Sequence, residues 1–131
     1  MEKNKEIALN LSWAISGGEW DTVDRLLSKD FQYIGDGNPA MNKEQYISFM
    51  RNVLCTGMTK MDMKFPRVIG EGSLVAVEYT NEMTHSGVFF GIPATGRRVL
   101  ATGQFIREVR NGQVTAEWQT TNALGLMKQL G

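Results

Sequence analysis

The sequence predicts an α+β fold in which three N-terminal helices lie against a strongly curved antiparallel sheet that is followed by a short C-terminal helix. Apolar residues recur at helical spacing up to residue 54, and from residue 58 they follow the two-residue period of a β-strand. Asn111-Gly112 separates two β-rich runs, and this dipeptide is the strongest short-range hairpin signal. With 131 residues and neither linker nor repeat, the chain is expected to form one domain over residues 1–131.

The first half of the chain is expected to be mostly helical. The predicted helices span residues 3–16, 20–28 and 42–56, with a short strand over residues 31–34. Ile7, Leu11 and Ile15 share one face of the first helix. Asn42 opens the third helix, with Gln45 three residues later as the partner in a capping box. These helices can therefore bury one apolar side each.

The second half is expected to form four long antiparallel strands. They cover residues 58–69, 73–85 and the two arms of a hairpin that runs from residue 99 to residue 122. Pro66 places the first of these strands at a sheet edge or a bulge, because proline cannot donate to the ladder. The length of the second strand indicates strong curvature. A loop follows over residues 87–97, and residues 124–130 are expected to dock as a cap.

The register of the hairpin decides which of its side chains lie on the same face. If the turn has two residues, the facing pairs are Arg110 with Gln113, Ile106 with Glu117, and Gln104 with Gln119. One face then carries neutral polar groups and the Glu117 carboxylate. The other face, with Phe105 and Trp118, is mostly apolar. Hydrophobicity alone places the apolar face inside and the polar face at the surface.

Composition restricts the partners and the compartment. Fourteen basic and fourteen acidic residues give zero net charge without a basic stripe, so neither nucleic acid nor a membrane is an expected partner. The N-terminus has no apolar signal region, and no apolar run reaches the ~18 residues of a membrane span. The single cysteine, Cys55, rules out an internal disulfide, and we expect a cytoplasmic protein. One histidine and one cysteine argue against the usual zinc site.

Several motifs, most of them in the last third of the chain, resemble one family pattern. THSGVFFGIPATGRRV at residues 84–99 is similar to T-H-x-G-x-F-x-G-[IV]-P-P-T-G-R-x-V. Phe105, Arg107, Gly112 and Val114 follow a second pattern of that family, and residues 18–27 match its second helix. Glu117-Trp118 and the C-terminal LGLMKQLG are similar to its E-x-W and L-G-L-L-x-Q-L-G. On these motifs the chain resembles the SnoaL-like polyketide cyclases.

The resemblance implies the cone-shaped α+β fold of the nuclear transport factor 2-like superfamily, in which a bent sheet wraps around helices and leaves a pocket at one end. It implies a homodimer through the outer face of the sheet. It also implies an intramolecular aldol step without metal or cofactor, so no cofactor is expected, and a small hydrophobic or aromatic molecule as the partner. The same fold carries isomerases, epoxide hydrolases, dehydratases and binding modules, so fold alone does not settle function.

The implied pocket reverses the assignment of the hairpin faces and puts the polar face inside. The family's acid–base aspartate falls on Gln119, and a second frequent aspartate falls on Asn122. Because glutamine cannot accept a proton, we expect Glu117 to move the proton while Gln104 and Gln119 position or polarise a carbonyl. The alternative is that Glu117 is solvated, or is the structural partner of a basic residue.

Further residues are candidates for substrate contact, namely Trp13, Tyr33, Phe49, Met50, Met63, His85, Ile106, Trp118, Thr121 and Asn122. Tyr33 can donate a hydrogen bond to a carbonyl, or it can be an ordinary core tyrosine. His85 fits a loop anchor better than a catalytic group, and Trp13 either walls the pocket or packs. The eight methionines fill a core, or they line an adaptable apolar pocket.

Three functions stay open on the sequence. The first is a cofactor-independent acid–base enzyme for cyclisation, isomerisation or hydration at a carbonyl-activated carbon of a hydrophobic substrate. The second is a non-catalytic ligand-binding or accessory dimer that has lost the family's catalytic aspartate. The third is a purely structural dimer with a filled core, which predicts no cavity of ~300 Å³ or more.

Overall fold

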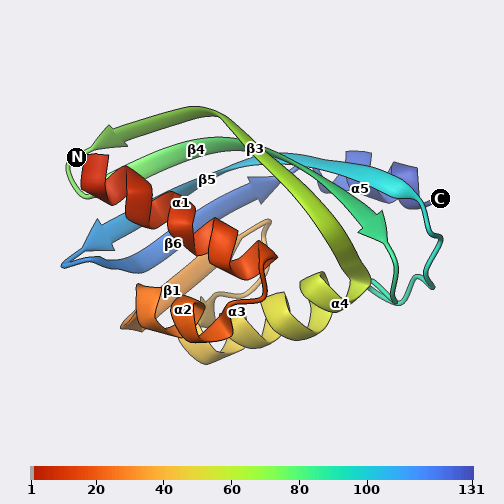
Figure 1. Ribbon diagram of the computed structural model, residues 1–131, viewed down its shortest axis with the longest axis horizontal. Helices are drawn as coiled ribbons and strands as arrows, with labels where there is room; N and C mark the ends of the chain where they lie inside the picture. Colours follow the sequence, from red (N-terminus) through yellow and green to blue (C-terminus); the bar gives the residue numbers. More distant parts are fainter. Residues whose placement is uncertain (1) are drawn as a thin grey trace.

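A six-stranded sheet arches over the helices in the computed structural model, which describes residues 2–131 (Figure 1). The helical elements are α1 (Glu2–Ser16), α2 (Trp20–Leu26), α3 (Lys43–Phe49), the π-helical turn η1 (Met50–Leu54), α4 (Cys55–Gly57) and α5 (Ala123–Leu130). The strands are β1 (Leu27–Gly35), β2 (Met41–Asn42), β3 (Met58–Glu71), β4 (Leu74–His85), β5 (Arg98–Arg110) and β6 (Gln113–Thr121). The predicted α+β class with a curved sheet is confirmed.

The order of the strands across the sheet is β2-β1-β6-β5-β4-β3. All neighbours are antiparallel except β1 and β6, which are parallel, a pairing that the sequence did not predict. β1 also begins at Leu27, four residues before the predicted strand. β3 is one of the two edge strands, the other being β2, and its register shifts between Lys64 and Arg67, where Pro66 interrupts the ladder as expected.

The core lies between the concave face of the sheet and the helices. Ile7, Leu11 and Ile15 of α1 are buried, and α1 crosses strands β3 to β6. The predicted capping box at the start of α3 is confirmed, because Asn42 Oδ1 accepts from the Gln45 N–H and Gln45 Oε1 accepts from the Asn42 N–H, both at 2.9 Å. This cap fixes the start of the helix that carries Tyr46 into the core.

The hairpin turn is confirmed but most of the predicted register is wrong. Asn111 and Gly112 both have positive φ, 52° and 78°, and Arg110 pairs with Gln113. A bulge at Thr115 then adds one residue to β6, because Val114 pairs with Val109 and Ala116 with Glu108. The pairs beyond the bulge are therefore Arg107 with Glu117, Ile106 with Trp118, and Phe105 with Gln119.

Because of the bulge, each face of the hairpin carries residues from both of the predicted faces. The inner face carries Phe105, Glu117 and Gln119, while Ile106 and Trp118 point outward and are each 41% exposed. Gln104 pairs with Thr120 and is exposed on the same outer face. Neither assignment of whole faces was therefore correct, because a one-residue slip changes the side on which each later side chain lies.

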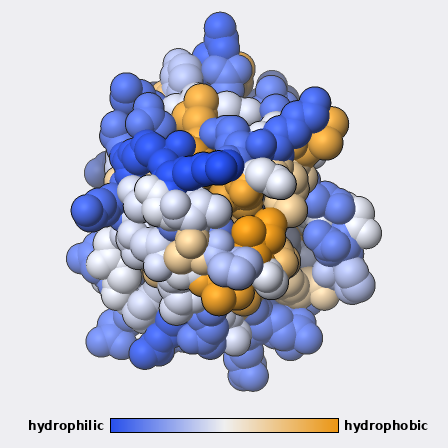
Figure 2. Space-filling model, turned by 90° about the vertical axis from the view of Figure 1, so that its right-hand side faces the viewer, coloured by the Kyte–Doolittle hydropathy of each residue, from blue (hydrophilic) through white to orange (hydrophobic). Residues whose placement is uncertain are grey.

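The end of the molecule near α5 is closed by the loop of residues 86–97. The His85 side chain anchors this loop, because its Nδ1 accepts from the Thr95 N–H at 3.2 Å and lies 2.9 Å from the Thr95 hydroxyl. Figure 2 faces this end and shows apolar side chains gathered among charged ones. Among the described residues, no helix has the length and hydropathy needed to cross a membrane.

Candidate functional site

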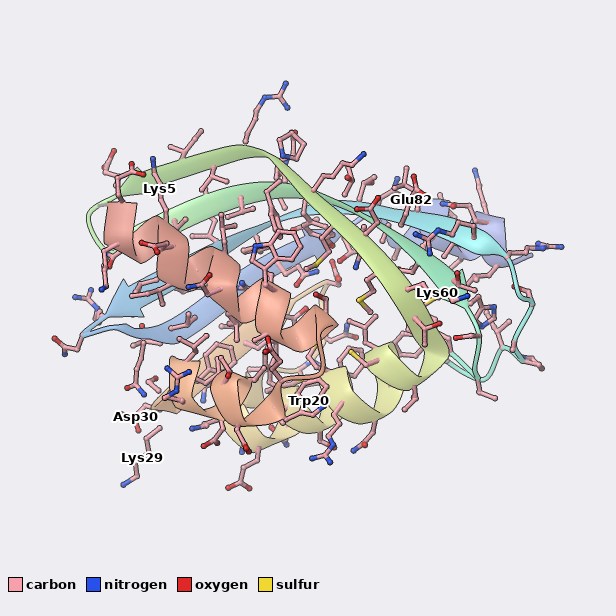
Figure 3. The ribbon with its side chains drawn as sticks, in the orientation of Figure 1. Lys5, Trp20, Lys29, Asp30, Lys60 and Glu82 are labelled. Carbon is pink, nitrogen blue, oxygen red and sulfur yellow. The ribbon has the colours of Figure 1, made fainter. Side chains whose placement is uncertain are left out.

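A cavity of about 810 Å³ lies between the concave face of the sheet and the helices. Six of the eight methionines line it, namely Met41, Met50, Met61, Met63, Met83 and Met127. Five phenylalanines complete most of the apolar wall. Figure 3 shows sulfur atoms in this space between the sheet and the lower helices. The volume lies within the range of small-molecule sites and argues against the filled core of the third alternative.

A smaller set of polar side chains lies along the same cavity. It includes Tyr33 of β1, Tyr79 and Asn81 of β4, Arg107 of β5, and Gln119 of β6. The only basic side chain of the lining is Arg107, and the only carboxylate is Asp36, in the loop after β1. Apolar walls with a few placed polar groups are typical of a site that holds a mostly hydrophobic ligand in one orientation.

Glu117 and Arg107 form a buried ion pair next to the cavity. Arg107 Nε donates to Glu117 Oε1 at 2.7 Å, and Glu117 has no exposed surface. Arg107 Nη1 donates to the backbone oxygen of Ala8 and to Ser12 Oγ of α1, which ties the sheet to the helix. Burial is the largest single influence and opposes the charge on Arg107, but Glu117 and Tyr46 together outweigh it and raise the pKa of the guanidinium.

Arg107 keeps part of its guanidinium free of protein partners. Its Nη2 makes no hydrogen bond within residues 2–131, although the side chain lines the cavity and is 97% buried. The Arg107 guanidinium also lies 4.0 Å from the centre of the Phe105 ring. An N–H group in this setting is available to an oxygen atom of a ligand.

Two tyrosines surround the ion pair. Tyr46 donates its hydroxyl proton to Glu117 Oε1 at 3.1 Å and is completely buried. Burial, and then the Glu117 charge, raise the pKa of Tyr46 well above its ordinary value. Burial, Glu117 and Asp36 likewise raise the pKa of Tyr33, whose hydroxyl makes no hydrogen bond within the described chain. Tyr33 therefore stays protonated and can donate to a ligand.

Gln119 belongs to a second hydrogen-bond network. Its Nε2 donates to the Tyr79 hydroxyl at 2.9 Å and to Thr121 Oγ1 at 3.0 Å. Burial raises the pKa of Tyr79, while the hydrogen bonds from Thr121 and Gln119 oppose that rise. Gln119 is thus held by protein groups at the cavity wall, with its amide oxygen left without a partner among residues 2–131.

The structure places six of the sequence candidates on the cavity lining, namely Tyr33, Phe49, Met50, Met63, Gln119 and Thr121. Glu117 lies directly behind that lining, as the partner of Arg107. The sequence had left this structural role open as the alternative to catalysis.

The remaining candidates lie away from the cavity lining. Gln104, Ile106 and Trp118 are on the outer face of the sheet, as the bulge requires. Trp13 packs edge-on against Phe65, with ring centres 5.2 Å apart, and it is 46% exposed. His85 anchors the loop of residues 86–97, and Asn122 caps α5 through its side chain, which accepts from the Gly125 N–H at 3.0 Å.

Sequence reasoning missed several polar groups at the cavity. Arg107 and Tyr46 follow the periodicity of apolar neighbours in the sequence, and Tyr79 and Asn81 lie within the predicted strand of residues 73–85, yet all four line the cavity. Asn81 is 8% exposed, and its Oδ1 has no partner among residues 2–131. Asp36 lies in the sequence Gly35-Asp-Gly-Asn-Pro39, whose composition is that of an ordinary loop. Its charge, beside two glycines, was the one sequence signal that could have separated it from an ordinary loop residue.

The part of the chain that the structure describes contains no cluster of metal-ligating side chains. No group of three or more His, Cys, Asp or Glu side chains in residues 2–131 could hold an ion. The polar groups present are instead hydrogen-bond donors and acceptors, which suit an organic ligand.

The fold and the cavity together define a cone-shaped α+β protein with an internal binding space. The sequence matches the family described as SnoaL-like polyketide cyclase over residues 5–130. The chain therefore belongs to the SnoaL-like polyketide cyclase family. No significant relative is found among curated proteins.

Solved structures support the same fold. A candidate SnoaL-like polyketide cyclase from Jannaschia sp. CCS1 is 26% identical, with a TM-score of 0.89 over 98% of this chain and 92% of that one. IdmH, a candidate polyketide cyclase from Streptomyces antibioticus, is 22% identical, with a TM-score of 0.86 over 98% of both chains. An LEH-like epoxide hydrolase from M. tuberculosis is 18% identical, with a TM-score of 0.79 over 99% of this chain and 90% of that one.

Proposed function

We propose that the protein binds a small hydrophobic, aromatic or polyketide-like molecule and acts on it as a cofactor-independent acid–base enzyme. The reaction would be a cyclisation, isomerisation or hydration at a carbon activated by a carbonyl. The observation that carries this proposal is the cavity of about 810 Å³, whose walls are methionine and phenylalanine and whose polar groups converge from four strands. Side chains alone can carry out the general acid–base catalysis that these reactions require.

The ligand carbonyl would meet the donors of the polar wall. The Tyr33 hydroxyl and the Arg107 Nη2 have no hydrogen-bond partner within residues 2–131, and both side chains line the cavity. Donors that are already positioned stabilise the negative charge that develops on a carbonyl oxygen during enolisation. Glu117 would act as a positioning residue, because it holds the Arg107 guanidinium and the Tyr46 hydroxyl in place.

A second polar function of the ligand would meet Asn81. Asn81 lines the cavity, faces Met63 across the β3–β4 pair, and leaves its buried Oδ1 without a partner among residues 2–131. A buried amide without a partner costs about 1–3 kcal/mol, which a donor group on the ligand would recover. A molecule with two separated oxygen functions on an apolar frame fits this arrangement.

The alternative is a non-catalytic binding protein of the same family. Two observations favour it. The position that carries the aspartate in the related cyclases is Gln119, whose amide is bound to Tyr79 and Thr121. Glu117 is bound to Arg107 and has no exposed surface. Under this alternative the ligand binds in the same cavity but is not turned over.

Methionine methyl NMR tests ligand binding directly. We expect 2-tetralone, a small aromatic ketone, to shift the ¹³C-methyl signals of the six methionines that line the cavity. Met58 is 1% exposed and is absent from the lining, so its signal is the internal control. Shifts confined to exposed or non-lining methionines, or no saturable shift at millimolar ketone, would contradict the proposal.

A cavity-filling variant supplies the matched test. Ala101 lies on the inner face of β5 and lines the cavity, so Ala101→Leu should weaken 2-tetralone binding at least about tenfold by occupying its space. Ala116→Leu adds the same side chain to the opposite face of the hairpin and should leave the affinity unchanged. Equal affinities for both variants would contradict binding in this cavity.

We further propose a homodimer through the outer face of the sheet. Five cross-strand neighbours form one apolar row on this face, in the order Ile34, Trp118, Ile106, Ala76 and Ile69. The four large side chains in it are between 40% and 65% exposed. A second copy presents the same row, and zero net charge adds no overall repulsion between copies.

A further inference from the structure

Asp36 supplies the only carboxylate on the cavity lining, and the contacts described above give it no structural partner of opposite charge. The side chain forms no salt bridge within residues 2–131. The other acidic residue close to the cavity, Glu117, is sealed behind the wall and paired. Asp36 is exposed, and among residues 2–131 it is the one carboxylate on the cavity lining that a ligand proton can reach.

The backbone holds Asp36 at the cavity in an uncommon conformation. Its φ is +51°, in the left-handed region that few residues other than glycine adopt. Its N–H donates to the Gln119 carbonyl at 3.3 Å, and its Oδ1 accepts from the Thr121 N–H at 2.8 Å. The first contact with β6 fixes the backbone of Asp36 and the second holds its carboxylate, and backbone outliers of this kind are often found at functional sites.

One carboxylate oxygen remains free. Asp36 Oδ2 makes no hydrogen bond within residues 2–131, while Oδ1 is held by Thr121. Thr121 links the carboxylate to Tyr79, because its N–H binds Asp36 Oδ1 and its hydroxyl lies 3.1 Å from the Tyr79 hydroxyl. The negative charge of Asp36 also contributes to the raised pKa of Tyr33, after burial and Glu117, and to the raised pKa of Tyr79, after burial. The free carboxylate oxygen therefore belongs to the same cavity lining as two tyrosine hydroxyls that remain protonated.

We propose that Asp36 is the acid–base catalytic residue of this cavity. In the step that it performs, a C–H bond next to the ligand carbonyl breaks and its proton passes to Asp36 Oδ2. The electron pair forms the enolate, whose oxygen accepts hydrogen bonds from Tyr33 and Arg107. Return of the proton to carbon restores the ketone, so no other reactant is needed. This inference rests on the proposed function, because it requires a carbonyl ligand in the cavity.

Hydrogen–deuterium exchange of 2-tetralone tests this step without knowledge of the natural substrate. The wild-type protein in D₂O should accelerate the loss of the ketone α-proton signals above the buffer rate. Asp36→Asn should lower the protein-dependent rate about 100-fold or more, the usual loss for a general base. Its affinity for 2-tetralone, measured by the methionine methyl shifts, should stay within about threefold.

The variant and its control are closely matched. Asparagine tolerates the left-handed backbone and keeps an Oδ1 that can accept from Thr121, and Asp36→Gly provides a second variant without strain at positive φ. Asp30→Asn removes the same charge from β1, where the side chain points away from the interior (Figure 3), and should keep the wild-type exchange rate.

The outcomes separate the two proposals. Wild-type protein that binds 2-tetralone without accelerating exchange would overturn the role of Asp36 and leave binding intact. Wild-type exchange in both Asp36 variants, or exchange lost equally in Asp30→Asn, would also overturn it. If 2-tetralone does not bind at all, the proposed function fails first, and the role of Asp36 fails with it.

Discussion

Glu117 illustrates how one residue type can take opposite roles. On the sequence it was the expected proton carrier, with the role of partner to a basic residue as the alternative. In the structure both Arg107 Nε and the Tyr46 hydroxyl bind the same oxygen, Oε1, and the side chain has no exposed surface. We infer that its negative charge mainly keeps the Arg107 guanidinium oriented in a region from which water is excluded.

Replacing Glu117 should therefore damage stability strongly. Glu117→Gln leaves the Arg107 charge buried without its counter-ion, and we expect the free energy of unfolding to fall by about 3–5 kcal/mol. Urea unfolding followed by fluorescence would measure this change. In the same assay Glu82→Gln, which breaks an exposed 3.6 Å pair with Arg98, should cost less than about 1 kcal/mol. Similar losses for both variants would contradict a structural role for the buried pair.

At the scale of elements, the hairpin β5–β6 has one feature that the sequence predicts, its turn, and one that the sequence does not predict, its bulge. The turn at Asn111-Gly112 was predictable because both of its positions need positive φ, and the capping box at Asn42 was predictable because it is local. The bulge at Thr115 was not predictable, because the alternation on either side of it is equally regular in both registers. Without the bulge, Glu117 could not be placed opposite Arg107.

The residues of the candidate site also fall into two groups, those that the sequence could mark and those that it could not bring together. Apolar periodicity marks Phe49 and Met50 as buried, and the sequence names both of them and Met63 as candidates for ligand contact. Whether the methionines fill a core or line a pocket stayed open on the sequence, and the structure places six of them on the cavity lining. Asp36 and Tyr33 could not be joined to Gln119, because the parallel pairing of β1 with β6 connects segments more than 80 residues apart. Nothing local in either strand encodes such a pairing.

Gly103 of β5 leads to a prediction about the stability of the sheet. A Cβ on Gly103 would clash with the Thr120 carbonyl and lie 2.8 Å from the Tyr79 hydroxyl. We expect Gly103→Ala to lower the free energy of unfolding by about 1–3 kcal/mol and to displace Tyr79 from Gln119. Urea unfolding and the NMR signals of the Gln119 side-chain amide would measure both effects. Thr102→Ala, at the neighbouring position of the same strand, should change stability by less than about 0.5 kcal/mol. A Gly103→Ala variant with wild-type stability would contradict the predicted crowding.

At the scale of the whole molecule, the sheet separates two apolar surfaces. The concave surface bounds the cavity, and the outer surface carries the row from Ile34 to Ile69. This division means that ligand binding and self-association can be altered by different substitutions on the same strands.

The proposed dimer can be tested from the centre of that row. Ile106→Lys places a charge among Trp118 and Ala76, so sedimentation velocity should show a 14.7 kDa monomer where the wild type shows about twice that mass. Asn52→Lys adds the same charge to η1, away from the sheet, and should remain dimeric. A wild-type protein that is monomeric at high micromolar concentration would contradict the proposed dimer.

The parallel pairing of β1 with β6 also sets the order in which the protein can be completed during synthesis. β1 leaves the ribosome early, but its partner strand spans residues 113–121, close to the end of the 131-residue chain. Until then Asp36 lacks its two hydrogen bonds to β6, and the edge of β1 that β6 will cover stays open to other chains. The polar wall of the cavity therefore cannot form before β6 has been synthesised, and ligand binding requires a chain that extends at least through residue 121.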